Sequence, residues 1–158
     1  MTGQERRGEH AFAHTLHDGQ GPMTIQHHFA GASRLPVAVQ TWTLGPGAFE
    51  GMHRHDDPPL EELYLVAEGR ARIRQDGQEH LLGPGDSLLS PAGAEHDLAC
   101  VSDQPLRVIV VWGPPGSVDL GGFGSVRRAL EVRAEAEARP ASEAGERRSR
   151  IEGAQRGK

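Results

Sequence analysis

The 158-residue sequence contains one cysteine, Cys100, one lysine, Lys158, and only 4% aromatic residues. A single cysteine cannot form an internal disulfide, so a secreted disulfide scaffold and a cysteine-rich zinc cluster are both excluded. No apolar run reaches the roughly 20 residues of a membrane-spanning helix, and the first 20 residues contain no stretch resembling a signal peptide. We therefore expect a cytoplasmic protein without a membrane partner.

Basic side chains are almost all arginine and are unevenly distributed. Residues 127–158 hold nine basic and six acidic residues, which leaves residues 1–126 with a net charge of about −8. Nucleic-acid binding relies on clustered Lys and Arg, so we expect no nucleic-acid partner. Arginine in place of lysine, with abundant Ala, Gly and Pro, is typical of a GC-rich bacterial genome.

Twenty-one glycines and 11 prolines indicate many turns, and short alternating segments lie between them. This spacing is typical of an all-β sandwich or small barrel. The Asp76-Gly77 pair predicts a hairpin. Strands are predicted over 37–44, 62–68, 70–75, 81–82, 87–90, 96–101 and 106–112.

The two ends of the chain differ in composition from the middle. We expect a flexible N-terminal segment over 1–21, a β-barrel over 22–120, and a linker, short helix and disordered tail over 121–158. The helix is predicted from Val126 to Arg139, with Ser125 as its N-cap and Pro140 ending it.

Two segments carry residue types that bind metal ions. One is His53-Arg54-His55 with Glu62 downstream, and the other is His96 after Pro91-Ala92-Gly93. Residues two apart on a strand point to the same face, so His53 and His55 can bind one ion if this stretch is extended. Three imidazoles and a carboxylate suit iron(II), manganese(II), nickel(II), cobalt(II) or zinc(II). Burying such a cluster in a dry core without an ion would cost free energy, which favours metal binding. In the alternative, metal-free interpretation, the histidines form a hydrogen-bonded cluster in the core.

These residues belong to a wider pattern that resembles the two motifs of the cupin family over roughly residues 35–112. Six residues separate His55 from Glu62, where the family has three or four, and Cys100 stands where its second motif has asparagine. The resemblance implies a single-domain jelly-roll β-barrel, a divalent transition metal, a small-molecule substrate and a homodimer, with residues 70–75 or 37–44 offering an edge strand. The matching positions are Gly47, His53, His55, Glu62 and Gly69, then Gly85, Pro91, Gly93 and His96.

The long gap before Glu62 leaves the identity of the carboxylate ligand open. Glu62 is preferred because it keeps the six-residue spacing to Gly69, whereas Glu61 would point to the opposite face of the strand. Asp56 or Asp57 would replace it if their loop folded inward. The predicted metal ligands are therefore His53, His55, Glu62 and His96.

Several other side chains are candidates for the pocket. Tyr64 shares the predicted face of Glu62, and these two are the predicted catalytic residues, although Tyr64 would also suit simple packing. Cys100 is expected to face inward without acting as a nucleophile. Arg107 either faces water or binds an acidic substrate. Trp42, Phe49, Met52 and Val66 are possible pocket walls, and no role is assigned to His10, His14, His17, His27, His28 or His80.

The leading hypothesis is a metal-dependent enzyme acting on a small molecule, with iron(II) and O2 in dioxygenase-type chemistry. A redox-neutral isomerase, lyase or cyclase that uses the ion as a Lewis acid is the first alternative. A non-catalytic module that senses a ligand or ion is the second. The fold alone does not choose among them.

Overall fold

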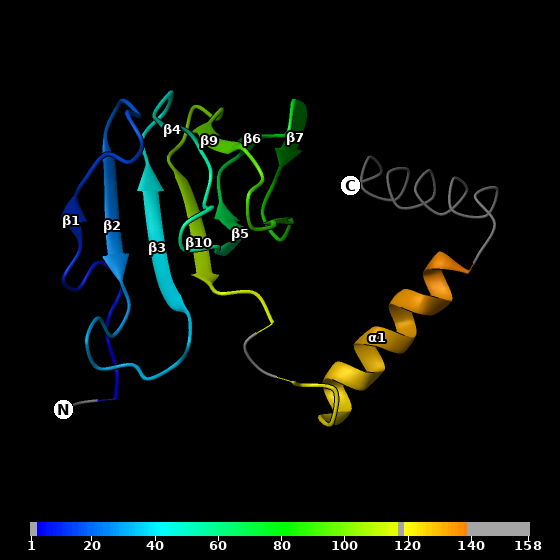
Figure 1. The fold of residues 1–158 in the computed structure, drawn as a ribbon. Helices are drawn as coiled ribbons and strands as arrows, with labels where there is room; N and C mark the ends of the chain where they lie inside the picture. Colours follow the sequence, from blue (N-terminus) through cyan, green and yellow to red (C-terminus); the bar gives the residue numbers. More distant parts are fainter. Residues whose placement is uncertain (1–2, 117–118, 139–158) are drawn as a thin grey trace, which may run out of the picture. The chain divides into compact units, whose positions relative to one another are not determined.

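The computed structural model describes residues 3–116 and 119–138, which belong to two separate compact units divided at Ser117–Val118. The first unit holds ten strands in two antiparallel sheets (Figure 1). One sheet has the order β1-β2-β3-β10-β5-β8 and the other β4-β9-β6-β7. The strands are β1 (Phe12–Ala13), β2 (Met23–His27), β3 (Ala38–Leu44), β4 (Phe49–His53), β5 (Glu61–Glu68), β6 (Ala71–Gln75), β7 (Gln78–Leu82), β8 (Ser87–Ser90), β9 (His96–Cys100) and β10 (Leu106–Gly113).

The predicted all-β fold is confirmed, and the predicted strands agree with the structure to within a few residues. The hairpin at Asp76-Gly77 joins β6 and β7, and both turn residues have positive φ, 48° and 79°, as a two-residue type I′ turn requires. Strands β1, β2 and β4 were not predicted.

The two strands expected to provide a sheet edge do not lie at one. Strand β3 lies between β2 and β10, and β6 lies between β9 and β7. Both are therefore fully paired, and the prediction of an edge at residues 37–44 or 70–75 is wrong. The terminal strands of the two sheets are β1, β8, β4 and β7.

The hydrophobic core lies between the two sheets. Alternate residues of β3, β5 and β10 point inward, so that Trp42, Tyr64 and Val108 are fully or almost fully buried. Ile73 of β6 and Leu98 of β9 meet them from the other sheet. Sheets packed in this way hold functional groups on their inner faces rigidly.

The segment before residue 22 packs on the first sheet, where the sequence had suggested a mobile lead. Strand β1 pairs with β2. The Gly8 N–H donates to Gln26 Oε1 at 2.8 Å, and Gln26 Nε2 donates to the Arg6 carbonyl at 3.0 Å. These bonds satisfy a side-chain amide that is 4% exposed, which explains how a polar residue is tolerated there.

The second unit contains α1 (Gly124–Glu137), none of whose residues is buried. The helix begins two residues before the predicted start, and its N-cap is Phe123, without a side-chain cap bond. Ser125 therefore lies in the first turn, and its predicted capping role is wrong. The predicted helix end at Arg139 and Pro140 lies outside the described residues. In the part of the chain that the structure describes, no helix has the length and apolar character to cross a bilayer.

Candidate metal centre

The four predicted ligands come together between the two sheets. His53 ends β4, His96 begins β9, and these two residues are directly paired across the strands. Glu62 lies on the inner face of β5, and His55 follows two residues after β4. The fold thus brings donors from both sheets to one point. The loop over 56–60 lies between His55 and Glu62 in the sequence and does not keep them apart in space.

The donor atoms lie at the separations expected around a single ion. Glu62 Oε2 is 3.1 Å from His96 Nε2, 3.2 Å from His55 Nε2 and 3.8 Å from His53 Nε2. The Nε2 atoms of His53 and His55 are 3.2 Å apart. Atoms that each lie about 2.0–2.2 Å from a common transition metal are separated by roughly 3–4 Å. The donor set therefore fits a divalent ion.

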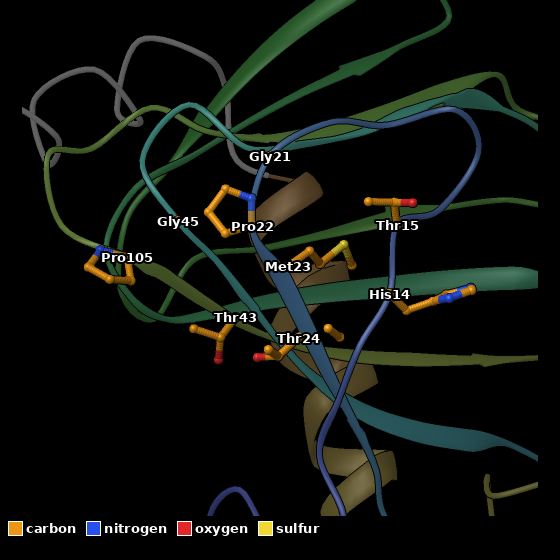
Figure 2. Close-up of a pocket in the computed structure, with 10 residues that line it drawn as sticks. His14, Thr15, Gly21, Pro22, Met23, Thr24, Thr43, Gly45 and Pro105 are labelled. Atoms are coloured by element: carbon orange, nitrogen blue, oxygen red, sulfur yellow. The ribbon is translucent and has the colours of Figure 1, made fainter.

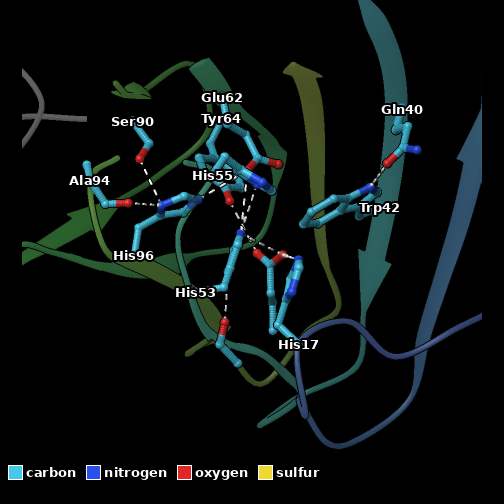
Figure 3. A network of polar contacts seen from close by, with 12 residues as sticks. His17, Gln40, Trp42, His53, His55, Glu62, Tyr64, Ser90, Ala94 and His96 are labelled. Atoms are coloured by element: carbon cyan, nitrogen blue, oxygen red, sulfur yellow. Dashed lines mark hydrogen bonds and ion pairs between the residues drawn. The ribbon is translucent and has the colours of Figure 1, made fainter. Parts of the chain in front are cut away.

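Hydrogen bonds at the far side of two rings fix which nitrogen faces the centre. Nδ1 of His53 is 3.0 Å from the Gly51 carbonyl, and Nδ1 of His96 is 3.0 Å from the Ala94 carbonyl (Figure 3). A carbonyl only accepts, so each Nδ1 carries the hydrogen and each neutral ring turns an Nε2 lone pair toward Glu62. Lone pairs that converge on a carboxylate need a positive charge among them, either a proton or a metal ion.

The electrostatics of the metal-free cluster show the same need for positive charge. Burial raises the pKa of Glu62, but hydrogen bonds that His53, His55 and His96 donate when their rings are protonated outweigh it and hold that pKa far below its usual range. Burial lowers the pKa of His96, but the hydrogen bond to Glu62 reverses this and raises it. A proton on His96 and a metal ion would thus compete for the same ring nitrogen, the one that faces Glu62.

A second buried carboxylate, Glu50, lies beside the cluster and was missed by the sequence analysis. In an unbroken strand residues 50 and 53 would face opposite sides. The register of β4 shifts, because Glu50 pairs with Leu98 while His53 pairs with His96, which gives β4 one extra residue. This β-bulge turns both side chains inward. Gly51, in the middle of an otherwise extended segment, is the signal that could have indicated it.

Only one of the two carboxyl oxygens of Glu50 has a hydrogen-bond partner among the described residues. The Tyr64 hydroxyl donates to Glu50 Oε2 at 3.2 Å, and both residues are 0% exposed. Glu50 Oε1 is buried and has no hydrogen-bond partner among the described residues. Burial and the nearby charge of Glu62 raise the pKa of Glu50 well above its usual range. Burial, with the charges of Glu50 and Glu62, also raises the pKa of Tyr64.

His17 lies on the cluster, so the prediction that it has no role in a solvated lead is wrong. Its ring stacks on that of His53 with centroids 3.6 Å apart and planes within 6° (Figure 3). Its Nε2 is 3.6 Å from Glu50 Oε1. Burial, followed by the charges of His53 and His55, lowers the pKa of His17 to about 4, so the ring is neutral near pH 7.

Close backbone contact holds His17 in this position. The Gly51 N–H donates to the Leu16 carbonyl at 3.2 Å, and Gln20 and Phe49 exchange backbone bonds of 3.1 and 2.9 Å. A Cβ on Gly51 would lie 1.6 Å from the His17 carbonyl oxygen, so only glycine allows this approach. The N-terminal segment thus runs along β4 and covers the cluster.

A pocket of about 320 Å³ opens beside the cluster. Its volume is at the lower end for small-molecule sites. Its polar side is formed by Glu50, Glu62, His14, His17, His55 and Gln40. Its apolar walls come from Phe12, Leu16, Ile25, Trp42, Leu60 and Trp112.

A larger cavity of about 620 Å³ lies elsewhere in the first unit (Figure 2). It is lined by backbone turns and small side chains around Met23 and Thr43, with His14 as its one titratable residue. Its lining includes no carboxylate and no second imidazole. The smaller pocket is therefore the better candidate for chemistry.

The remaining predicted residues lie away from the four donors. Asp56 and Asp57 are exposed, and Glu62 is the carboxylate that reaches the cluster. Cys100 is buried as predicted, but its sulfur contacts the Gln104 carbonyl at 3.6 Å. Arg107 lies 3.8 Å from Glu68 and lines a separate small cavity.

Trp42 and Val66 are buried in the core, and Trp42 also lines the pocket as predicted. Met52 is 43% exposed, because the bulge that turns Glu50 and His53 inward leaves it facing outward. Its predicted place in the pocket wall is therefore wrong.

Two antiparallel sheets that enclose three imidazoles and a carboxylate define a β-barrel of the jelly-roll class with a candidate metal site. Residues 40–112 match the family described as the cupin domain. The chain belongs to the cupin superfamily, and the resemblance seen in the sequence is confirmed.

Solved structures show the same fold. A predicted oxalate decarboxylase from Thermotoga maritima is 18% identical with a TM-score of 0.60, over 66% of this chain and 91% of that one. A cupin domain of an XRE family transcriptional regulator from Enterobacter cloacae is 19% identical, with a TM-score of 0.53 over 59% and 97%. A cupin sugar phosphate isomerase from Silicibacter pomeroyi is 26% identical, with a TM-score of 0.51 over 58% and 59%. Cupins of different function thus share this architecture.

Proposed function

We propose that this protein is a metal-dependent enzyme that acts on a small molecule in the 320 Å³ pocket, with His53, His55, Glu62 and His96 as the metal ligands. The observation that carries the proposal is the set of Nε2 lone pairs directed at Glu62 Oε2 beside an apolar pocket. A purely structural ion would have no need of an adjacent cavity.

The pocket residues have separable tasks in this proposal. Trp42, Leu60 and Trp112 would bind the apolar part of a substrate and exclude water. The carbonyls of Gly51 and Ala94 hold the rings of His53 and His96 in the tautomer that presents Nε2. A bound divalent ion would supply Lewis acidity, and iron(II) would add one-electron chemistry with O2.

Iron(II) and O2 in dioxygenase-type chemistry is the reaction that we propose first. A redox-neutral isomerase, lyase or cyclase is favoured by one specific observation, the buried Glu50 and Tyr64 pair. A carboxyl group with a raised pKa beside a pocket can hold and move a proton near neutral pH, which such reactions require. Tyr64 would then position Glu50 and would not itself meet the substrate.

Metal analysis of protein purified anaerobically, followed by O2 uptake, tests the proposal. We expect about one ion per chain, lost in His96→Ala and retained in His80→Ala, a matched change outside the cluster. Uptake of O2 by the iron-loaded protein with a panel of phenols, enols and alcohols would support dioxygenation. Turnover by the zinc- or manganese-loaded protein under argon would select the redox-neutral reaction. A chain that holds no ion even after reconstitution would contradict both.

We also propose that the chain forms a homodimer through the outer face of β10, β5 and β8. Ile109 pairs with Leu65, Val111 pairs with Leu63, and Leu63 pairs with Leu89 in register across these strands. Leu65 and Leu89 are 36% and 52% exposed. A contiguous apolar sheet face of this kind is typical of an interaction surface.

A further inference from the structure

The pocket contains a polar atom that neither the fold nor the four proposed ligands use. Glu50 lines the pocket, and its Oε1 is buried and has no hydrogen-bond partner among the described residues. The imidazole nitrogens nearest to it, Nε2 of His17 and of His53, are 3.6 and 3.7 Å away, beyond hydrogen-bond distance. Buried polar groups in proteins almost always have a partner, so this oxygen calls for one.

The orientation of Glu50 is fixed by its surroundings. The Tyr64 hydroxyl holds Oε2, and the bulge in β4 directs the whole side chain inward. If the Glu50 carboxyl group rotated so that Oε1 accepted from the Tyr64 hydroxyl, Oε2 would take the position of Oε1 and would be the unpaired oxygen. The Tyr64 contact and the bulge thus hold the unpaired oxygen in one place beside the pocket, in the manner of a preorganised binding group.

The charge of the pocket limits what the partner can be. Among the described residues that line it there is neither Arg nor Lys, and Glu50 and Glu62 both line it, so apart from the proposed ion nothing near Glu50 favours a carboxylate, sulfate or phosphate group. Most of the wall is apolar. A hydroxyl group both donates and accepts, so it can pair with Oε1 of Glu50 as an acceptor or, when Oε1 carries the proton, as a donor, whereas a ketone only accepts and an ammonium only donates.

We infer that Glu50 is the specificity-determining residue of a subsite that binds the hydroxyl group of a neutral substrate with an apolar body, such as a phenol, enol or alcohol. The inference rests on the proposed function, because it places this hydroxyl beside the metal centre. His17 closes the subsite by stacking on His53 from the N-terminal segment.

A pair of probes tests the subsite on the full-length, zinc-loaded chain. Resorcinol carries two hydroxyls too far apart to chelate one ion, and 3-methylphenol replaces one of them by a methyl group. Both tryptophans of the chain, Trp42 and Trp112, line the pocket, so their two indole N–H signals in ¹H–¹⁵N spectra report binding directly. We expect the wild type to bind resorcinol at least about tenfold more tightly than 3-methylphenol.

Three variants separate Glu50 from general effects. Glu50→Leu keeps the side-chain size and should abolish the preference for resorcinol. Glu50→Gln keeps a hydrogen-bond donor and an acceptor at this position, so it should retain most of the preference for resorcinol over 3-methylphenol. Glu61→Gln removes a charge on β5 outside the pocket and should bind like the wild type.

Equal preference in the wild type and Glu50→Leu, or no binding of either phenol to the wild type, would overturn the subsite. Two zinc ions per wild-type chain and one in Glu50→Leu would also overturn it, because His17, Glu50 and His53 would then form an ion site. Metal content on the same samples tests the proposed function separately. A Glu50-dependent preference in a chain that holds no ion would contradict the metal enzyme and support the subsite.

Discussion

Replacing Gly51 by alanine tests whether the N-terminal segment is a fixed part of the site. The added Cβ would lie 1.6 Å from the His17 carbonyl oxygen and 2.7 Å from its carbonyl carbon. Both atoms are backbone, so no side-chain rotation relieves the overlap. Residues 16–20 must move away from β4 by roughly 1.5 Å to restore ordinary contact distances.

The cost of this movement follows from the bonds that it breaks. Three backbone hydrogen bonds of 2.9–3.2 Å join Leu16 and Gln20 to Phe49 and Gly51, and a shift of that size would lengthen each beyond bonding distance. At about 1 kcal/mol each, their loss amounts to roughly 2–3 kcal/mol. For a domain of this size we expect Tm to fall by roughly 5–15 °C.

Thermal unfolding followed by circular dichroism measures the effect, with Gly83→Ala as the control. A Cβ on Gly83 would meet only Asp86 Oδ2 at 3.7 Å, an ordinary contact, so its Tm should stay close to that of the wild type. Metal content of Gly51→Ala should also stay unchanged, because none of the four proposed ligands lies in residues 16–20. A Tm of Gly51→Ala within about 2 °C of the wild type would refute the close packing of the segment on β4.

Three further predictions address the cluster and the sheet face. Zinc added to the metal-free chain should release protons, measured in weak buffer, because the raised pKa of His96 favours a proton on the ring and the ion displaces it. A binding reaction without proton release would contradict this. Because the pKa of Glu50 is raised, the metal-free chain loses stability as pH rises above the ordinary carboxyl value near 4.5. In urea unfolding, Glu50→Gln should therefore be more stable than the wild type at pH 7 by roughly 1–3 kcal/mol and equally stable at low pH. Leu89→Glu places a charge on the proposed dimer face and should shift the chain to monomer in light scattering, and an unchanged mass would argue against that face.

Much of the fold and the proposed ligand set could be predicted because they follow from regular alternation. Glu62 and Tyr64 are two apart on one unbroken strand, so their shared inward face could be deduced without knowing any other contact. The choice of Glu62 over Glu61 rested on the same rule, and the structure places Glu62 at 3% exposure in the cluster.

Glu50 could not be found in this way because it depends on an irregularity. Counting back from His53 by alternation puts Glu50 on the outer face, and only the extra residue of the bulge reverses this. His17 was missed for a different reason. It has no spacing relation to the motif residues, and its position comes from a backbone approach that the absence of a side chain at Gly51 permits.

These two irregular features divide the site between different parts of the chain. The proposed ligands come from β4, β5, β9 and the residue pair after β4, all within residues 53–96. Phe12, Leu16 and His17 in the pocket wall come instead from the N-terminal segment, which is joined to β4 by backbone bonds. Backbone bonds place no demand on side-chain identity, but Leu16 also packs against the hydrophobic core and His17 stacks on His53, so these two side chains contribute to the core and to the cluster. In the proposed function the ion would be held by residues within 53–96, whereas the N-terminal segment and the barrel strands together form the pocket wall, with Glu50 beside both.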